Sequence, residues 1–209
     1  MGATKIEMVQ QVTQFDLAPA RYARPDRLSD VSGLAVEVVD RLLGHERFVE
    51  RLSARLISRL ELPSCRNAII GRKDLALALR PPENIAALGA VFGSLWHASA
   101  IRHVIAREER HALIASIGAG LHAFILRQPA LDRLTEADGT TPLSERIDRD
   151  GRALVKRWLA RLPTAFAKRI ALMLPVAADR DIGELAVPPA LMATLVAGAM
   201  AWFEDNADV

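Results

Sequence analysis

The sequence predicts an all-α protein of about eight helices packed around a central pair of apolar helices. The apolar residues make up 51% of the chain and are mostly alanine, leucine, isoleucine and valine. Alanine and leucine are strong helix formers, and no segment shows the alternation and hairpin turns of paired strands. Two long runs, residues 84–101 and 112–126, carry no fixed charge. Because a helix that is apolar nearly all round is a buried helix, these runs are expected to form the core.

Length and composition limit the class of protein. The 209 residues fit one α-helical domain over residues 1–209, or an N-terminal subregion, residues 1–80, packed on a main body, residues 81–209. Cys65 is the only cysteine, which excludes an internal disulfide and a cysteine-based zinc site and favours a reducing cytoplasm. The formal net charge of +2 does not by itself indicate a nucleic-acid partner.

Prolines divide the N-terminal part of the chain. Pro19 and Pro25 prevent one continuous helix, and each can open a short helical turn. Asp30 or Ser32 is expected to cap the next helix, which runs to about Leu43.

A charged row follows on a second amphipathic helix, residues 46–60. Like charges four residues apart disfavour an isolated helix by about a few tenths of a kcal/mol each, so the row is a candidate for meeting acidic groups on another protein or on nucleic acid. The alternative is an ordinary solvated face with carboxylate partners elsewhere in the fold. This arginine row consists of Arg47, Arg51, Arg55 and Arg59.

The two charge-free runs are expected to form the central helix pair, separated by a charged break over residues 102–111. A membrane hairpin is the alternative, but a spanning helix needs about 20 apolar residues, and these runs are shorter and contain serine and histidine. Glycines without side chains are expected to let neighbouring helices approach closely. They are Gly89, Gly93, Gly118 and Gly120.

The C-terminal part is punctuated by prolines and by a polar interval, residues 135–142. Ser144 is a good cap for the first of three further helices. A loop is expected over residues 177–186. The three helices are expected over residues 145–162, 164–174 and 190–203.

Motifs for catalysis are not found in the sequence. There is no phosphate-binding loop and no nucleophile elbow. Residues 108–111 contain one Glu-x-x-His motif, whereas a di-iron bundle needs two such motifs and two further glutamates. His97 and His122 are expected to be hydrogen-bonded core residues, and His103 and His111 to lie in the polar break. Cys65 is expected to be an inert thiol, so no enzyme activity, metal or cofactor is predicted.

Three stretches, taken together and in order, resemble the SctK family of type III secretion proteins, the YscK and PscK type. Phe15–Leu28 is similar to the family's pattern of phenylalanine, an apolar residue, proline, tyrosine and a closing leucine. In Leu88–Leu126 a glycine-rich apolar helix leads to His97 and a further apolar helix. In Arg152–Pro175 a Trp-Leu pair precedes Lys-Arg and a closing Leu-Pro. The chain has no histidine near Arg24 where relatives often carry one, and residues 31–80 match poorly.

The resemblance implies a non-enzymatic cytoplasmic adaptor of the injectisome sorting platform, required for protein secretion and virulence. Such proteins link the cytoplasmic domain of the inner-membrane ring protein SctD to the pod protein SctQ, which connects to SctL and the ATPase SctN. The implied location is peripheral, at the inner-membrane face of the apparatus, without membrane insertion, nucleic acid or cofactor. A helical nucleic-acid-binding regulator is the alternative function.

Partner binding is expected from the Phe15–Leu28 segment together with the arginine row. The surface that meets SctD and the surface that meets SctQ are not distinguished by the sequence. The candidate residues are Phe15, Tyr22, Arg24, Arg27, Arg47, Arg51, Arg55 and Arg59.

Overall fold

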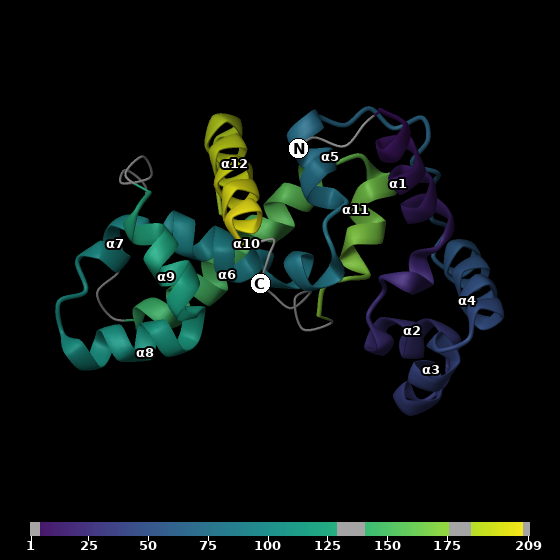
Figure 1. Ribbon diagram of the computed structural model, residues 1–209, viewed down its shortest axis with the longest axis horizontal. Helices are drawn as coiled ribbons and strands as arrows, with labels where there is room; N and C mark the ends of the chain where they lie inside the picture. Colours follow the sequence, from purple (N-terminus) through teal and green to yellow (C-terminus); the bar gives the residue numbers. More distant parts are fainter. Residues whose placement is uncertain (1–4, 129–140, 176–184, 207–209) are drawn as a thin grey trace. The chain divides into compact units, whose positions relative to one another are not determined.

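The computed structural model describes residues 5–128, 141–175 and 185–206, and within them the protein is all-α, as predicted (Figure 1). These residues form twelve α-helices and one short 3-10 helix, more than the expected eight because glycines and prolines divide the chain more often. The helices are α1 (Lys5–Leu17), η1 (Pro19–Arg21), α2 (Pro25–Ser32), α3 (Val36–Leu43), α4 (Glu46–Arg59), α5 (Arg72–Ala78), α6 (Pro82–Trp96), α7 (Ala98–Arg102), α8 (Arg107–Ile117), α9 (Ala119–Leu126), α10 (Leu143–Arg161), α11 (Thr164–Ala171) and α12 (Pro189–Asp205).

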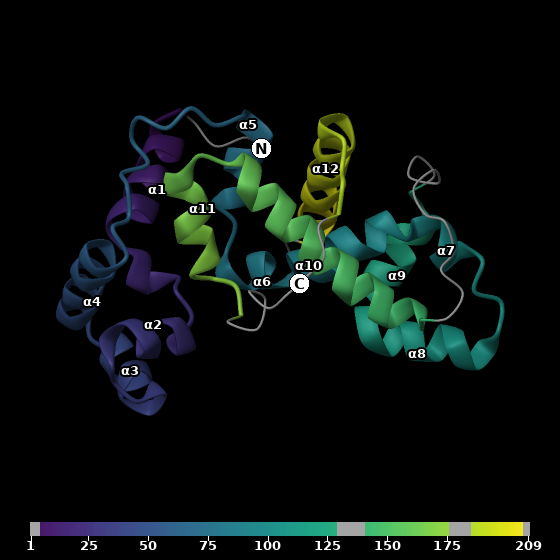
Figure 2. The ribbon, with the colours of Figure 1, turned by 180° about the vertical axis from the view of Figure 1, so that it is seen from behind.

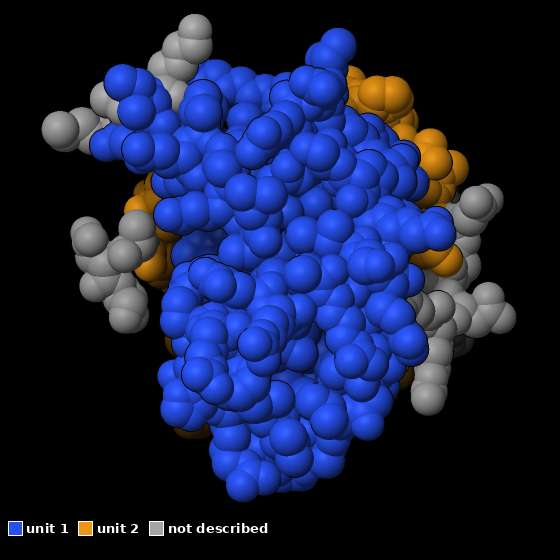
Figure 3. All heavy atoms as spheres, turned by 90° about the vertical axis from the view of Figure 1, so that its right-hand side faces the viewer, with its two compact units in different colours: residues 1–86, 159–179 blue, residues 87–158, 180–209 orange. Residues whose placement is uncertain are grey.

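The chain divides into two compact units, coloured separately in Figure 3. Unit 1 contains residues 1–86 and 159–179, and unit 2 contains residues 87–158 and 180–209. One cooperative domain over the whole chain remains a prediction, as does the N-terminal subregion. The predicted polar interval and the predicted loop before the last helix lie largely outside the described residues.

The N-terminal helices of unit 1 are set by proline and glycine. Pro19 and Pro25 each lie in the first turn of a helix, η1 and α2, as predicted. Helix α2 ends at Ser32, and the next residue, Gly33, has a φ of 73°, a left-handed conformation that glycine adopts without steric cost. The predicted caps were therefore wrong, because Asp30 and Ser32 lie inside α2 and the next helix starts only at Val36.

The core of unit 1 is an apolar cluster beneath α2, α3 and α4. Helices α1 and α11 lie side by side in both views of the ribbon (Figures 1 and 2), and the rings of Phe15 and Phe166 stack there with centroids 5.8 Å apart. The long-range contact between these helices brings the start of the chain against its C-terminal third. The buried members of the cluster are Ala20, Ala23, Leu28, Val39, Val49, Leu52, Leu56, Leu62 and Leu172.

The predicted central helix pair of unit 2 has different boundaries in the structure. The first run forms α6 and the short helix α7. Residues 103–106 of the charged break lie outside helices, and the rest of the break forms the start of α8. Arginine and glutamate are good helix formers, and Glu108 and Glu109 in the first turn of α8 interact favourably with the helix dipole. Gly118, with a φ of 86°, then separates α8 from α9.

Close backbone approach holds α6 against α10 within unit 2. A Cβ atom added to Gly93 would overlap the carbonyl of Ile147, and one added to Gly151 would overlap the carbonyl of Gly89. The predicted role of the glycines is thus confirmed at Gly93 but not at Gly118, which has no atom within contact distance of an added Cβ. Beside this crossing, the rings of α6 and α10 meet edge to face. These rings belong to Phe92 and Trp158.

None of the helices in the described ranges is long and apolar enough to cross a membrane.

Candidate functional site

Phe15 and Tyr22 hold the N-terminal segment from inside. Phe15 is 6% exposed, and its ring stacks on that of Tyr22 with centroids 4.8 Å apart. The Tyr22 hydroxyl donates a hydrogen bond of 2.8 Å to the carbonyl of Phe15. Burial raises the pKa of Tyr22, against the opposing charge of Arg169. Both rings therefore position the segment, and their contribution to a partner surface would be indirect.

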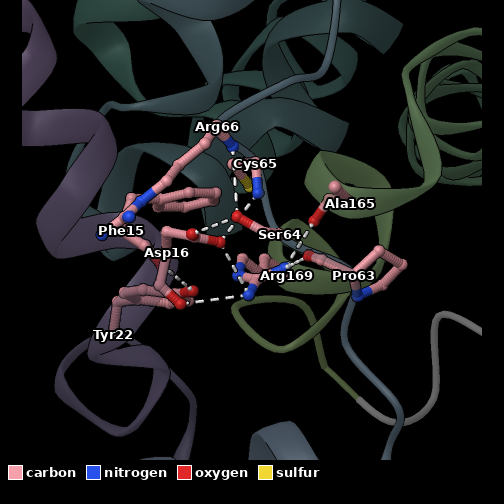
Figure 4. A network of polar contacts seen from close by, with 9 residues as sticks. All are labelled: Phe15, Asp16, Tyr22, Pro63, Ser64, Cys65, Arg66, Ala165 and Arg169. Carbon is pink, nitrogen blue, oxygen red and sulfur yellow. Dashed lines mark hydrogen bonds and ion pairs between the residues drawn. The ribbon is translucent and has the colours of Figure 1, made fainter.

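A buried ion pair lies next to these rings (Figure 4). Asp16 is 3% exposed and Arg169 is 1% exposed, and an Nη2–Oδ1 distance of 2.9 Å joins them. The Ser64 hydroxyl and the Cys65 backbone N–H donate to the two carboxylate oxygens at 2.7 and 2.8 Å. Arg169 also donates to three backbone carbonyls. These belong to Asp16 at 3.0 Å, Ala165 at 3.1 Å and Pro63.

This network joins parts of unit 1 that are far apart in the sequence. A buried charge is stable only when it is paired and hydrogen-bonded, and here both charges have several partners. Burial raises the pKa of the Cys65 thiol to about 12, which favours the protonated and less reactive form at neutral pH. Sequence reasoning did not predict the network, because Asp16 and Arg169 are separated by most of the chain and neither lies in a recognisable motif.

Arg24 and Arg27 attach the N-terminal segment to the end of α11. Arg24 forms an ion pair with Asp26 at 3.1 Å, and its backbone N–H donates to the carbonyl of Leu172 at 2.9 Å. The guanidinium group of Arg27 donates to the carbonyls of Leu174 and Pro175, at 3.3 Å each. Burial acts to raise the pKa of Asp26, but hydrogen bonds from Arg24 and the Arg27 backbone outweigh it and leave that pKa below its ordinary value. Both arginines are half-buried, so they have structural contacts and also reach the surface.

The arginine row lies on the outer face of α4, as predicted, and all four side chains are exposed. Arg55 donates to the Ser32 carbonyl at the end of α2 at 3.2 Å, and Arg47 lies 5.2 Å from the ring of Phe48. Arg51 and Arg59, like Arg47, form no ion pair with any residue that the structure describes. The described residues thus supply no carboxylate partner for these three cations.

The histidines of unit 2 form no metal site within the described ranges. His97 is 2% exposed, and its Nε2 lies 2.8 Å from a carboxylate oxygen of Asp150, which confirms a hydrogen-bonded core residue. Burial lowers the pKa of His97 against the opposing effect of Asp150, so the imidazole is neutral. His122 is also buried, whereas His103 and His111 are exposed.

Comparison with known proteins gives one family and two relatives. The family model described as "YOP proteins translocation protein K (YscK)" matches residues 11–198. The chain is 33% identical over 87 residues to the nodulation protein NolU of Rhizobium fredii and to that of Sinorhizobium fredii (strain NBRC 101917 / NGR234). Each match covers 40% of this chain and 40% of the relative, so it spans about two fifths of the length of these curated proteins. No solved structure matches the chain.

The family match confirms the resemblance that the three sequence stretches indicated. It includes the Phe15–Leu28 segment, the arginine row and most of the helices of both units. Proteins of this family are components of type III secretion. Because the YscK family model matches well over half of the chain, the chain belongs to the YscK family of type III secretion proteins.

Proposed function

We propose that this protein is a non-enzymatic cytoplasmic adaptor of the injectisome sorting platform. It links the cytoplasmic domain of SctD to the pod protein SctQ, and through SctQ to SctL and the ATPase SctN. Its place is at the inner-membrane face of the secretion apparatus. The observation that carries the proposal is the exposed arginine row, for which the described residues supply no carboxylate partner, on a chain of the YscK family.

The arginine row supports docking because its positive charges are costly to the helix that bears them. Four like charges at four-residue spacing destabilise α4 slightly, and a partner's acidic surface would relieve that repulsion. Complementary charge also accelerates association and fixes the register of the two surfaces. Arg24 and Arg27 lie at the surface of the neighbouring segment, and Phe15 and Tyr22 hold that segment in place from the core. All eight candidate residues thus have a place in this proposal, six at the surface and two beneath it.

The test is calorimetry of the protein with the SctD cytoplasmic domain and with SctQ, at two salt concentrations. The variant carries Arg51→Glu and Arg59→Glu, because these side chains have no intramolecular partner among the described residues. A matched control carries Lys156→Glu and Arg157→Glu, two exposed cations on α10. We expect saturable binding that weakens about tenfold or more in the row variant and changes little in the control.

Nucleic acid is the other class of acidic partner, and the same variants test it. Binding of duplex DNA with a steep salt dependence, lost in the row variant, together with no binding of either secretion protein, would replace the adaptor by a nucleic-acid-binding regulator. Equal loss of binding in the row variant and in the control would show a general effect of charge and would remove the arginine row from the interface.

A further inference from the structure

A groove of about 450 Å³ lies in unit 1 between α2, the end of α4 and α11. Its volume is within the range of pockets that hold a ligand or an anchoring side chain. The floor is apolar, formed by Val31, Leu60, Leu62, Ala171 and Leu172. Leu62 and Leu172 are members of the apolar cluster of unit 1, and Leu60 packs against it. The core of unit 1 therefore holds the floor of the groove in place.

Positive charge predominates around the groove. Lys168 lines it and donates to the carbonyls of Leu60 and Glu61 at 3.0 and 3.3 Å, which orient the ammonium group. Within the described part of the chain this ammonium group has no carboxylate partner. Arg27 also lines the groove, and among the described residues that line it Asp30 is the one carboxylate.

The arginine row continues to the edge of this groove. Arg55 is hydrogen-bonded to the carbonyl of Ser32, the residue after Val31 of the floor. Arg59 directly precedes Leu60, another floor residue. Both observations place the C-terminal end of the arginine row next to residues that line the groove.

We propose that this groove receives an apolar side chain from a partner protein, on a segment whose neighbouring residues are aspartate or glutamate. The apolar floor would bury the anchor, and the surrounding cations would meet the acidic neighbours. None of the described lining residues is aromatic, so they offer no ring on which a nucleic-acid base could stack. The inference rests on the proposed adaptor function and names the chemistry of one of its contacts.

The direct test fills the groove. Ala171 is half-buried and lines it, so Ala171→Trp would occupy the space of the anchor, whereas Thr164→Trp places the same side chain at an exposed position of the same helix. The probes are the SctD cytoplasmic domain and SctQ, with folding checked by circular dichroism. We expect Ala171→Trp to weaken the binding of one of them about tenfold or more and Thr164→Trp to change it less than about twofold.

A second variant acts in the opposite direction and does not depend on filling the groove. Asp30 is exposed, and Asp30→Asn removes the carboxylate that would repel an acidic segment. We expect about two- to fivefold tighter binding of the same probe, an effect that a loss of structure would not produce. If Ala171→Trp does not fold, the binding of Asp30→Asn is the result that supports or overturns the proposed groove.

The outcomes separate the two proposals. Wild-type protein that binds neither probe contradicts the adaptor function and this inference together. Wild-type protein that binds, with a folded Ala171→Trp variant that binds equally well or an Asp30→Asn variant that does not bind more tightly, overturns the groove and leaves the adaptor function standing.

Discussion

The two units of this protein are stabilised in different ways. Unit 1 combines amphipathic helices with a buried ion pair, Asp16 and Arg169, that connects α1, α11 and the loop after α4. Unit 2 depends on apolar helices and on close backbone approach at Gly93 and Gly151. Unit 1 also bears the exposed arginine row and the groove. The difference indicates that directional polar contacts fix the surface proposed to bind partners, whereas the apolar helices of unit 2 are held by close packing together with the buried contact between His97 and Asp150.

The largest expected effect is the loss of the buried ion pair. Arg169→Ala leaves the buried Asp16 carboxylate without its counter-charge, so the free energy of unfolding should fall by about 3–5 kcal/mol. Urea unfolding measures it. The double variant Asp16→Leu, Arg169→Met removes both charges and should lose less than Arg169→Ala alone. A loss below about 1 kcal/mol for Arg169→Ala would contradict a structural role of the pair.

A methyl group at the helix crossing of unit 2 should have the next largest effect. Gly151→Ala places a Cβ against the backbone carbonyl of Gly89, which cannot move without shifting α6 or α10. We expect a loss of about 1–3 kcal/mol in the same unfolding experiment. Gly120→Ala is the control, because its Cβ meets only the end of the Trp202 side chain at 3.2 Å. Similar losses for the two variants would show that the crossing is not closely packed.

A pH titration should distinguish the neutral histidine of unit 2. Because burial lowers the pKa of His97 in the folded state, the unfolded chain binds the proton more readily. The free energy of unfolding should therefore fall as the pH drops below about 6.5, by at most about 1.4 kcal/mol per pH unit from this residue. His97→Gln keeps a donor for Asp150 and should flatten this dependence. An unchanged slope in the variant would assign the pH dependence to other groups.

The smallest expected effect is on the arginine row. Arg51→Gln removes one of the repelling charges of α4, so the free energy of unfolding should rise by about a few tenths of a kcal/mol. The same variant should weaken partner binding. Thermal unfolding and calorimetry measure the two quantities. Stability that falls together with binding would indicate a structural role for Arg51.

The sequence predicted those features that depend on local pattern. The all-α class, the arginine row on one helix face and the proline that opens α2 follow from residue spacing and propensity. The predicted helix boundaries were wrong where the backbone conformation of a single residue ends a helix. Gly33 is the example, because its left-handed φ ends α2 before the next helix begins. The expected break over residues 102–111 is non-helical only at residues 103–106, because the glutamates and arginines that follow favour helix and start α8.

The features of unit 1 that depend on long-range contacts were not predictable in this way. Asp16 and Arg169 meet only because α1 packs on α11, and no local signal connects them. The groove likewise needs α2, the end of α4 and α11 together. Of the candidate residues, sequence spacing located the exposed row, but it did not show that Phe15 lies in the core.

The most direct test of the adaptor function is whether the protein joins its two partners. The SctD cytoplasmic domain and SctQ are mixed with and without the protein, and the mass of the complex is measured by size-exclusion chromatography with light scattering. We expect a ternary complex only when the wild-type protein is present, and its loss with the Arg51→Glu, Arg59→Glu variant. A complex of SctD with SctQ that forms equally well without the protein, or binding of at most one partner at a time, would contradict the linking role.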